Sequence, residues 1–286
     1  MAMMKRSTGM EHGGIFTLDD QGPITYLRVE SELPIQCGFT TRFGGVSTTP
    51  YASANMGFHV GDDPQLVRRN RQLLAAMLAG GRRSLPLVTV SQVHGNRCQV
   101  VEDVAPGALQ QLADQQADAL LTSRSGVLLG VLTADCLPVI VVDRQCRGIA
   151  VVHAGWRGIL ARVVPRTLAA MAARFAVQLE DVLVFFGPCI GSCCYQVGPE
   201  LVERFVRELP FAADLSWRTK EDDGDCHLDM PRLQRLQLEA LGVPESSIHE
   251  TGRCTCCENF FFSYRSDHAI TGRQIAFAGF QADYRP

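Results

Sequence analysis

The stretch VLTADCLPVIVVDRQCRGIAVVHAGWRG, residues 131–158, decides the fold. It contains two apolar runs, LPVIVV and GIAVV, with a short polar segment between them. Apolar runs of this length, rich in β-branched residues and joined by a polar turn, predict a buried β-hairpin. Cys136 precedes the first run and His153 follows the second. A hairpin would therefore bring a thiol and an imidazole to the same end of a sheet.

The length of the turn sets the register of this hairpin. A two-residue loop at Arg144 and Gln145 places Cys136 directly opposite His153. Directly opposed side chains lie on the same side of a sheet, with their Cβ atoms about 4.5–5.5 Å apart. This loop sequence is not one that favours a type I′ turn, so a longer loop or a bulge would shift the register.

A third residue with the same chemistry lies upstream. The segment LVTVSQVHG predicts a strand that ends at His94. Two histidines and one cysteine are typical of a catalytic zinc site, which keeps an open position for water and lowers the pKa of that water. The Cys136–His153 pair also fits a cysteine nucleophile, with Asp135 or a backbone group orienting the imidazole. Residue type alone does not separate a ligand from a nucleophile.

The rest of the chain predicts a mixed architecture. Capping residues, proline positions and apolar stripes predict helices. These helices are at residues 64–78, at 159–175 with Pro165 kinking or breaking it, from Pro199, and near Pro231 behind the cap Asp229. Strands are predicted at residues 34–40, 87–93, 127–132, 138–142, 148–152, 182–186, 260–264 and 274–280. Helices and strands do not alternate strictly, which predicts an α+β fold of mixed β-sheets flanked by helices.

Length and composition limit the classes of function. The chain has 286 residues, 46% of them hydrophobic and 20% charged, and a formal net charge of −3. This predicts a single large domain over residues 15–286 after a flexible leader at residues 1–14, and gives no basic footprint for nucleic acid or a membrane surface. The leader has no apolar segment of a signal peptide, and no apolar stretch reads as a membrane span. Eleven cysteines, several of them adjacent, suit no disulfide framework and predict a cytoplasmic location.

Several motifs occur in one order along the chain. They are FTTRFGGVS, SQVHG, ADALLT, TADCLPV, HAGWRG, GPCIGSCCYQVG and the CTC…FFSYR…TGRQ tail. Together they closely resemble the laccase-domain family, long labelled multicopper polyphenol oxidase, over roughly residues 17–280. The resemblance implies zinc ligands at His94, Cys136 and His153, the same three residues. It also implies a single domain of mixed sheets wrapped by helices, shared distantly with a toxin deamidase that uses a Cys–His pair.

The resemblance implies a purine nucleoside enzyme. Adenosine, inosine, guanosine and methylthioadenosine would be cleaved by phosphate, and adenosine would be deaminated to inosine. Some relatives are peptidoglycan-editing factors, so an amidase that removes a wrong amino acid from a muramyl precursor is the alternative. A metal-binding or interaction protein without activity is a third interpretation. A closed, purine-sized pocket would favour the nucleoside enzyme, and an open pocket would favour the amidase. A metal whose ligand positions are all filled by protein would favour the third interpretation.

Other residues are candidates for contacts with substrate. Arg42 is predicted to bind phosphate and to act in catalysis, because a guanidinium offers two parallel donors and the glycines after it allow close approach. Asn55, in a loop that matches the family pattern, is expected to contact ribose. Arg157 is a further candidate for substrate binding, although stacking with Trp156 is the preferred interpretation. Gln92 should point away from His94 on the opposite face of its strand.

The remaining cysteines are expected to be buried thiols. Cys189, Cys193 and Cys194 form one group, and Cys254, Cys256 and Cys257 form another. Neither has the paired CxxC spacing of a zinc ribbon, although the two groups could meet to form a second metal site. The chain has seven histidines and no His-x-His pair, which excludes laccase chemistry as the main activity. Zn²⁺ is the predicted cofactor. Two histidines and a cysteine also accept copper, which is the less favoured metal.

Overall fold

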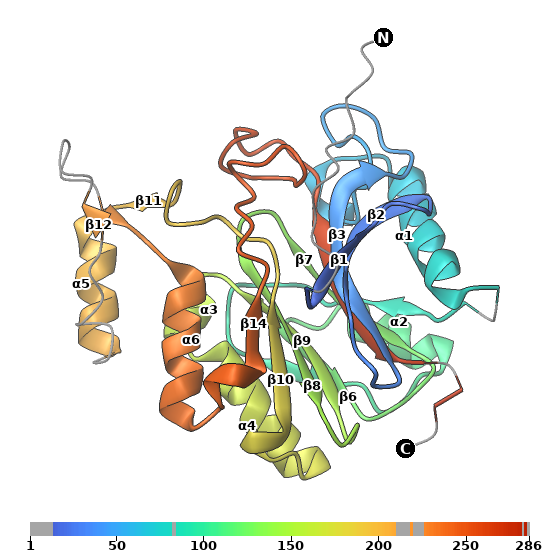
Figure 1. The fold of residues 1–286 in the computed structure, drawn as a ribbon. Coiled ribbons are helices and arrows are strands. Elements are labelled where there is room, and N and C mark those ends of the chain that lie inside the picture. The colour runs from blue at the N-terminus through green and yellow to red at the C-terminus, as the bar shows by residue number, and fades with distance from the viewer. Residues whose placement is uncertain (1–13, 82–83, 210–217, 220–225, 282, 285–286) are drawn as a thin grey trace.

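The fold is built on two six-stranded sheets (Figure 1). The computed structural model describes residues 14–81, 84–209, 218–219, 226–281 and 283–284. The first sheet has the order β1 (Phe16–Asp19), β2 (Ile24–Val29), β3 (Ile35–Gly44), β15 (Gln274–Phe280), β7 (Leu128–Thr133), β4 (Leu87–Val88). The second has the order β14 (Ile248–Glu250), β10 (Val182–Phe186), β8 (Leu137–Asp143), β9 (Ile149–Ala154), β6 (Ala119–Thr122), β5 (Cys98–Val100).

Both sheets are mixed. The outer pairs β4–β7, β5–β6 and β10–β14 are parallel, and the other pairs in these sheets are antiparallel. A small third sheet joins β11 (Gln196–Val197), β13 (Cys226–His227) and β12 (Arg218–Thr219). The predicted α+β fold of mixed sheets flanked by helices is confirmed.

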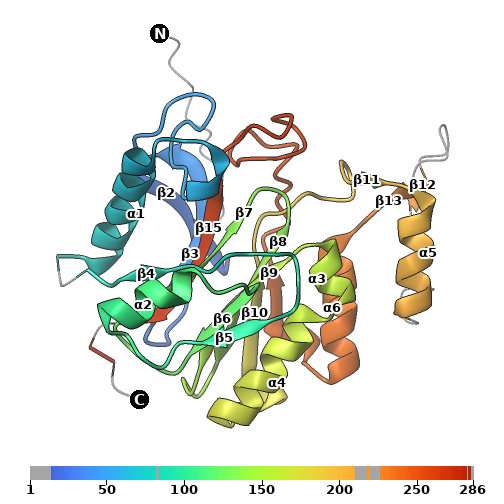
Figure 2. The same cartoon turned by 180° about the vertical axis from the view of Figure 1, so that it is seen from behind.

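Three apolar clusters arrange the elements as four layers. The central cluster lies between the sheets and includes Phe39 of the first and Ile140 of the second. A second cluster packs Leu74 of α1 (Pro64–Ala79) against Phe277 on the outer face of the first sheet. The third packs α3 (Trp156–Leu160), α4 (Val163–Phe175) and α6 (Met230–Leu241) on the outer face of the second sheet. Figure 2 shows α4 and α6 on the side away from α1. The remaining helices are α2 (Pro106–Ala113) and α5 (Pro199–Glu208), with 3-10 turns η1 (Phe58–Val60), η2 (Leu179–Asp181) and η4 (Glu245–Ser247).

Most predicted helices are confirmed. Asp63 caps α1 and Asp229 caps α6 through their side chains, and α5 begins at Pro199. The helix predicted at residues 159–175 is instead two helices, because Arg162 adopts a left-handed conformation with φ of 59°. Pro165 does not break this segment, since it lies in the first turn of α4, where a missing N–H costs nothing. The short helix α2 was not predicted.

Some predicted strands are wrong. The strand expected at residues 87–93 pairs regularly only over β4, and residues 260–264 form bends and turns. The strands β1, β2, β5, β6 and β14 were not predicted. β1 and β2 pair with each other as a local hairpin, whereas β14 pairs with the distant β10. The leader predicted at residues 1–14 lies outside the described residues except for Gly14, so the domain boundary stays a prediction.

The central hairpin exists, but its predicted register is wrong. β8 pairs with β9 so that Pro138, not Cys136, lies opposite His153. Cys136 stands two positions before Pro138 and therefore lies on the same side of the sheet. The thiol and the imidazole are therefore still close, as diagonal neighbours across the β8–β9 pair.

A longer loop causes this shift. The N–H of Asp143 donates to the carbonyl of Gly148, so the loop spans residues 144–147. The buried Asp143 carboxylate accepts hydrogen bonds from the backbone N–H of Arg147 at 2.9 Å and from its guanidinium at 2.7 Å. These bonds fix the longer loop, and Arg144-Gln145 is not a sequence that favours a two-residue turn.

Among the described residues, no helix combines the length and the apolar character that a membrane crossing needs.

Candidate metal centre

Three potential metal ligands meet where the layer between the two sheets ends. The ligand atoms of His94, Cys136 and His153 all lie within 4.8 Å of one another. The two imidazole rings are 4.7 Å apart between centroids and nearly perpendicular. Along β9, Ile149 and Val151 face the first sheet, so alternation places His153 on this inner face as well.

Asp118 organises the centre, and no role was predicted for this residue. Its fully buried carboxylate accepts the backbone N–H of His94 at 2.9 Å and that of Gly95 at 2.7 Å. It also lies 2.8 Å from Nδ1 of His153. An acceptor at Nδ1 holds the proton there and leaves Nε2 free as a ligand atom. One carboxylate therefore sets the tautomer of one imidazole and the position of the other.

His94 reaches the centre from a turn, so the strand predicted to end at this residue is wrong. Its φ is 58°, a left-handed conformation that side chains rarely adopt. The bonds from Asp118 to the backbone of His94 and Gly95 hold this turn in place.

The electrostatics of the centre favour an ionised thiol. Burial opposes ionisation of Cys136, but the charge and hydrogen bond of His153, together with His94, lower its pKa to about 6. Burial likewise opposes protonation of His153, but the Cys136 thiolate and Asp118 raise its pKa to about 9. A thiolate is the form of cysteine that binds metals.

The turn that carries Cys136 is anchored by the residue before it. Asp135 adopts a φ of 96°. Its carboxylate accepts hydrogen bonds from the Thr255 hydroxyl at 2.6 Å and from the backbone N–H of Arg265 at 2.7 Å. Asp135 was one candidate to orient the imidazole, but Asp118 has that position.

Gly155 leaves the room that the ligands need. A Cβ atom at this position would lie 3.0 Å from Sγ of Cys136 and 3.2 Å from Cδ2 of His94. Such contacts would push the thiol or the imidazole out of place. Gly155, the first glycine of the HAGWRG motif, therefore fits a site in which both groups converge on one ion.

A cavity of about 1550 Å³ opens onto the centre and is lined in part by His94 and Cys136. Its wall also includes His59, Arg71 and Arg273. Arg71 donates to the Met56 carbonyl at 2.8 Å and to the Thr89 hydroxyl at 3.2 Å. Neither partner is an anion, and burial lowers the pKa of Arg71 to about 10. The wall therefore offers cationic groups to a ligand.

Arg273 belongs to the same cationic wall. Its guanidinium donates to the carbonyls of Thr271 and Gly272, at 3.0 and 2.9 Å. The pKa of Arg273 is lowered by burial, and the negative charges of Cys136 and Asp135 offset part of this effect. Arg71 and Arg273 together also lower the pKa of His59, after burial itself.

Two predicted substrate contacts lie away from this wall. Arg42 is not among the cavity-lining residues. Its guanidinium lies 3.6 Å from the Asp267 carboxylate and stacks over the Phe262 ring at 4.9 Å. Arg157 is exposed and stacks on the Trp156 ring at 4.2 Å, which is the arrangement preferred from the sequence.

Asn55 lies behind the wall. Its side chain is fully buried, and its amide donates to Asp62 at 2.9 Å. Its carbonyl oxygen accepts the backbone N–H groups of Gly57 and Arg273, each at 2.9 Å. A residue bonded in this way supports Arg273 and has no group left for ribose.

Replacing Asn55 with alanine should lower the free energy of unfolding by about 3 kcal/mol, because it leaves buried donors and an acceptor without partners. Urea denaturation measures this loss. Asn96→Ala is the control, since Asn96 makes one hydrogen bond, to the Ala161 carbonyl. It should cost about 1 kcal/mol. Equal losses in the two variants would contradict the supporting role of Asn55.

Gln92 also has a structural role. Its amide nitrogen donates to the carbonyl of Leu132 at 2.8 Å, and its oxygen accepts the N–H of Leu132 at 2.7 Å. It thereby joins the segment before His94 to the edge of β7, while it also lines the cavity.

The other cysteine groups differ from the expectation of buried thiols. Cys189 is buried, but Cys193 and Cys257 are exposed, and Cys194, Cys254 and Cys256 are half-buried. The expectation is therefore wrong for these five residues. They lie in loops and turns that follow β10 and β14.

Comparison with known proteins identifies the family. A family model described as multi-copper polyphenol oxidoreductase laccase matches residues 36–281. The chain belongs to this family. The resemblance found in the motifs is thereby confirmed. The residues of this centre that could hold a metal are one thiol and two imidazoles.

Relatives of the laccase-like family cover most of the chain. Purine nucleoside phosphorylase YlmD of Geobacillus stearothermophilus is 41% identical over 249 residues, which span 85% of this chain and 89% of that protein. Purine nucleoside phosphorylase YfiH of Escherichia coli is 40% identical over 241 residues, 83% of this chain and 90% of that protein. The crystal structure of YlmD from G. stearothermophilus matches with a TM-score of 0.83 at 38% identity, over 93% of this chain and 99% of that one.

Sequence reasoning missed three residues of this centre. Asp118 stands in the ADALLT motif directly before β6, so its position next to a buried strand was the available signal. Arg273 lies in the TGRQ motif. Arg71 is one of several arginines in α1, and only the packing of that helix distinguishes it from its neighbours.

Proposed function

We propose that the protein is a zinc-dependent purine nucleoside enzyme. It cleaves adenosine, inosine, guanosine and methylthioadenosine with phosphate, and it deaminates adenosine to inosine. One observation carries this proposal: a group of one thiol and two imidazoles opens, through Cys136 and His94, onto the same cavity as arginines that have no anionic partner among the described residues. The names of the relatives support the phosphorylase part.

His94, Cys136 and His153 would hold the metal. The low pKa of Cys136 provides a thiolate, and the carboxylate of Asp118 keeps the proton of His153 on Nδ1. When bound, Zn²⁺ supplies a Lewis acid that activates water for attack on the purine ring. The eleven cysteines are free thiols, which suits our proposal of a cytoplasmic location.

The cationic wall would bind phosphate. Phosphorolysis joins a phosphate oxygen to C1′ of the ribose, and the purine leaves with the electrons of the glycosidic bond. Arg71 and Arg273 would hold the anion against the sugar and stabilise charge as that bond loosens. Arg42, which the sequence suggested for this role, already lies beside Asp267.

Chromatography of adenosine incubated with the purified protein tests the proposal. Inosine formed without phosphate would establish deamination. Free adenine or hypoxanthine formed only with phosphate would establish phosphorolysis. No turnover of any of the four nucleosides by zinc-loaded protein would overturn the proposal.

Arg71→Gln should raise the KM for phosphate about 10–100-fold, because a charge-assisted contact with the anion is lost. Deamination measured without phosphate should stay within about twofold of the parent enzyme, since it needs no anion. Arg69→Gln is the matched control, because Arg69 is exposed on the same helix and does not line the cavity. An unchanged KM for phosphate in Arg71→Gln would remove Arg71 from the phosphate site.

The size of the cavity favours a second candidate. At about 1550 Å³ it exceeds the roughly 300–1,000 Å³ that is usual for a small ligand. A muramyl-peptide precursor would fit better than a nucleoside alone, and an amidase would use the same centre against a carbonyl carbon. Release of an amino acid from such a precursor, with no turnover of nucleosides, would establish this activity. A metal-binding protein without activity, the third interpretation, predicts no turnover of either class.

A further inference from the structure

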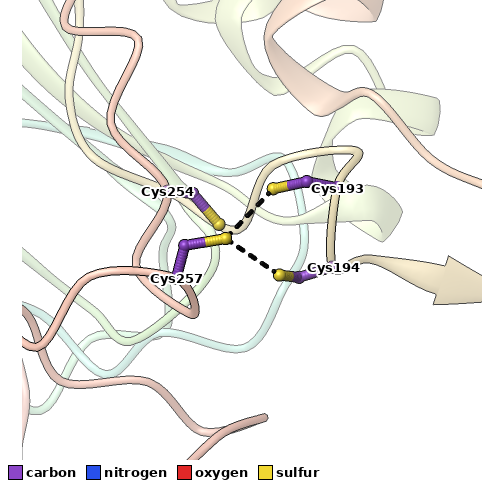
Figure 3. A group of neighbouring side chains, drawn as sticks. All are labelled: Cys193, Cys194, Cys254 and Cys257. Carbon is purple, nitrogen blue, oxygen red and sulfur yellow. Dashed lines mark hydrogen bonds between the residues drawn. The ribbon is translucent and has the colours of Figure 1, made fainter.

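A second group of sulfur atoms lies outside the centre described above. Cys193 and Cys194 stand in the loop that follows β10, and Cys254 and Cys257 stand in the turn that follows β14. All four Sγ atoms lie within 4.8 Å of one another. Sγ of Cys257 is 3.4 Å from that of Cys193 and 3.2 Å from that of Cys194 (Figure 3).

We propose that Cys193, Cys194, Cys254 and Cys257 form a second, structural metal site that binds one Zn²⁺ through four thiolates. Zinc binds thiolates tetrahedrally with Zn–S bonds of about 2.3 Å, which places the sulfur atoms about 3.8 Å apart. The four sulfur atoms are already grouped on this scale. Four thiols this close can ionise together only around a cation, because like charges at this distance repel strongly.

Local backbone geometry supports a thiolate at Cys254. Cys254 and Cys257 form a C-x-x-C pair within one turn, a spacing typical of structural zinc ligands. The backbone N–H of Gly191, from the other loop, donates to Sγ of Cys254 at 3.2 Å. Such bonds favour the charged form of sulfur and orient it as a ligand.

The arrangement fits an ion better than a disulfide. Sγ of Cys257 approaches two partners almost equally, in two adjacent residues of the opposite loop. A disulfide would use one of them and leave two thiols of the group unbonded. A metal ion would use all four, and its entry is open because Cys193 and Cys257 are exposed.

The proposed site would fasten two loops that support the first centre. Next to the thiols, the N–H of Thr255 donates to the carbonyl of Cys189 at 3.0 Å. The hydroxyl of Thr255 donates to the carboxylate of Asp135, and the N–H of Ile190 donates to the backbone carbonyl of Asp135. Asp135 directly precedes Cys136. A metal across the two loops would therefore brace the turn that presents the Cys136 thiol, without sharing a ligand with the first centre.

Zinc content of the full-length protein, purified with a non-thiol reductant and measured by mass spectrometry, tests this site independently of any enzymatic activity. The parent protein should hold two Zn²⁺ per chain. Cys136→Ala should hold one, and the double variant C254S/C257S should also hold one. Cys256→Ser is the matched control, because Cys256 lies in the same turn but outside the group of four, and should hold two.

Cobalt gives a second readout that does not depend on the folding of the double variant. Co²⁺ added to metal-free Cys136→Ala protein should give the intense sulfur-to-cobalt charge-transfer absorption of several thiolates, which zinc then displaces. The proposal would be overturned if the parent protein held only one Zn²⁺ and cobalt-treated Cys136→Ala protein lacked this absorption. A mass two hydrogens lower than the reduced chain, with no second metal, would assign a disulfide instead.

Discussion

Cys136→Ala is expected to abolish phosphorolysis and deamination and to remove the metal from the first centre. The two histidines that remain rarely hold zinc tightly, and no thiolate is left to balance the charge of the ion. Activity should fall by at least about 10³-fold, the scale on which removal of one member of a catalytic unit acts. Nucleoside turnover and zinc content, measured on the same preparation, check both expectations.

Cys98→Ala is the control for this variant. Cys98 is a half-buried thiol in β5 of the same sheet, and it belongs to neither group of potential ligands. Its replacement should leave activity and metal content unchanged. Full deaminase activity in Cys136→Ala would mean that the reaction takes place elsewhere in the molecule.

Asp118→Asn is expected to weaken zinc binding about 10–100-fold, the usual effect of removing the carboxylate that orients a metal-binding histidine. The amide keeps the size of the side chain but loses its charge. Its NH₂ group also replaces one of the two acceptor oxygens, so it cannot satisfy both His153 and Gly95 as the carboxylate does. Turnover at low zinc should fall by a similar factor and recover in part when zinc is added. Competition with a chromophoric chelator measures the zinc affinity.

Asp143→Asn separates a positioning role from general loss of stability. Asp143 is equally buried and is paired with Arg147 at the far end of β8. This control should lower the free energy of unfolding without changing the zinc affinity. If both variants lost stability equally and both kept the zinc affinity of the parent protein, Asp118 would be a structural carboxylate only.

The chemistry of the first centre could be predicted from local patterns. Cys136 and His153 flank two apolar runs, and an antiparallel hairpin of these runs brings the two residues to the same end of the sheet. The register could not be predicted, because it depends on a loop that Asp143 closes through its side chain. The role of Asp118 depends on contacts with β9 and with the turn at His94, which are distant in sequence.

The cavity wall was predicted least well. Arg42 and Asn55 were chosen because loop motifs carry them, yet one is engaged by Asp267 and the other is fully buried. Arg71 reaches the cavity only because α1 packs on the first sheet. The helix itself was predictable from its cap and apolar stripe, but not the sheet on which it packs.

The groups of the metal centre and the arginines of the cavity wall come from different parts of the fold. β7 belongs to the first sheet and β8 to the second, and the turn with Asp135 links them. His153 lies in β9, and Cys136 and Asp118 directly precede β8 and β6 of the second sheet. Arg71 lies in α1, which packs on the first sheet, and Arg273 directly precedes β15 of that sheet. Under the proposed function, substitutions in α1 and directly before β15 would change the cavity wall without touching the three potential metal ligands. Directed evolution aimed at a different leaving group would begin with these two segments.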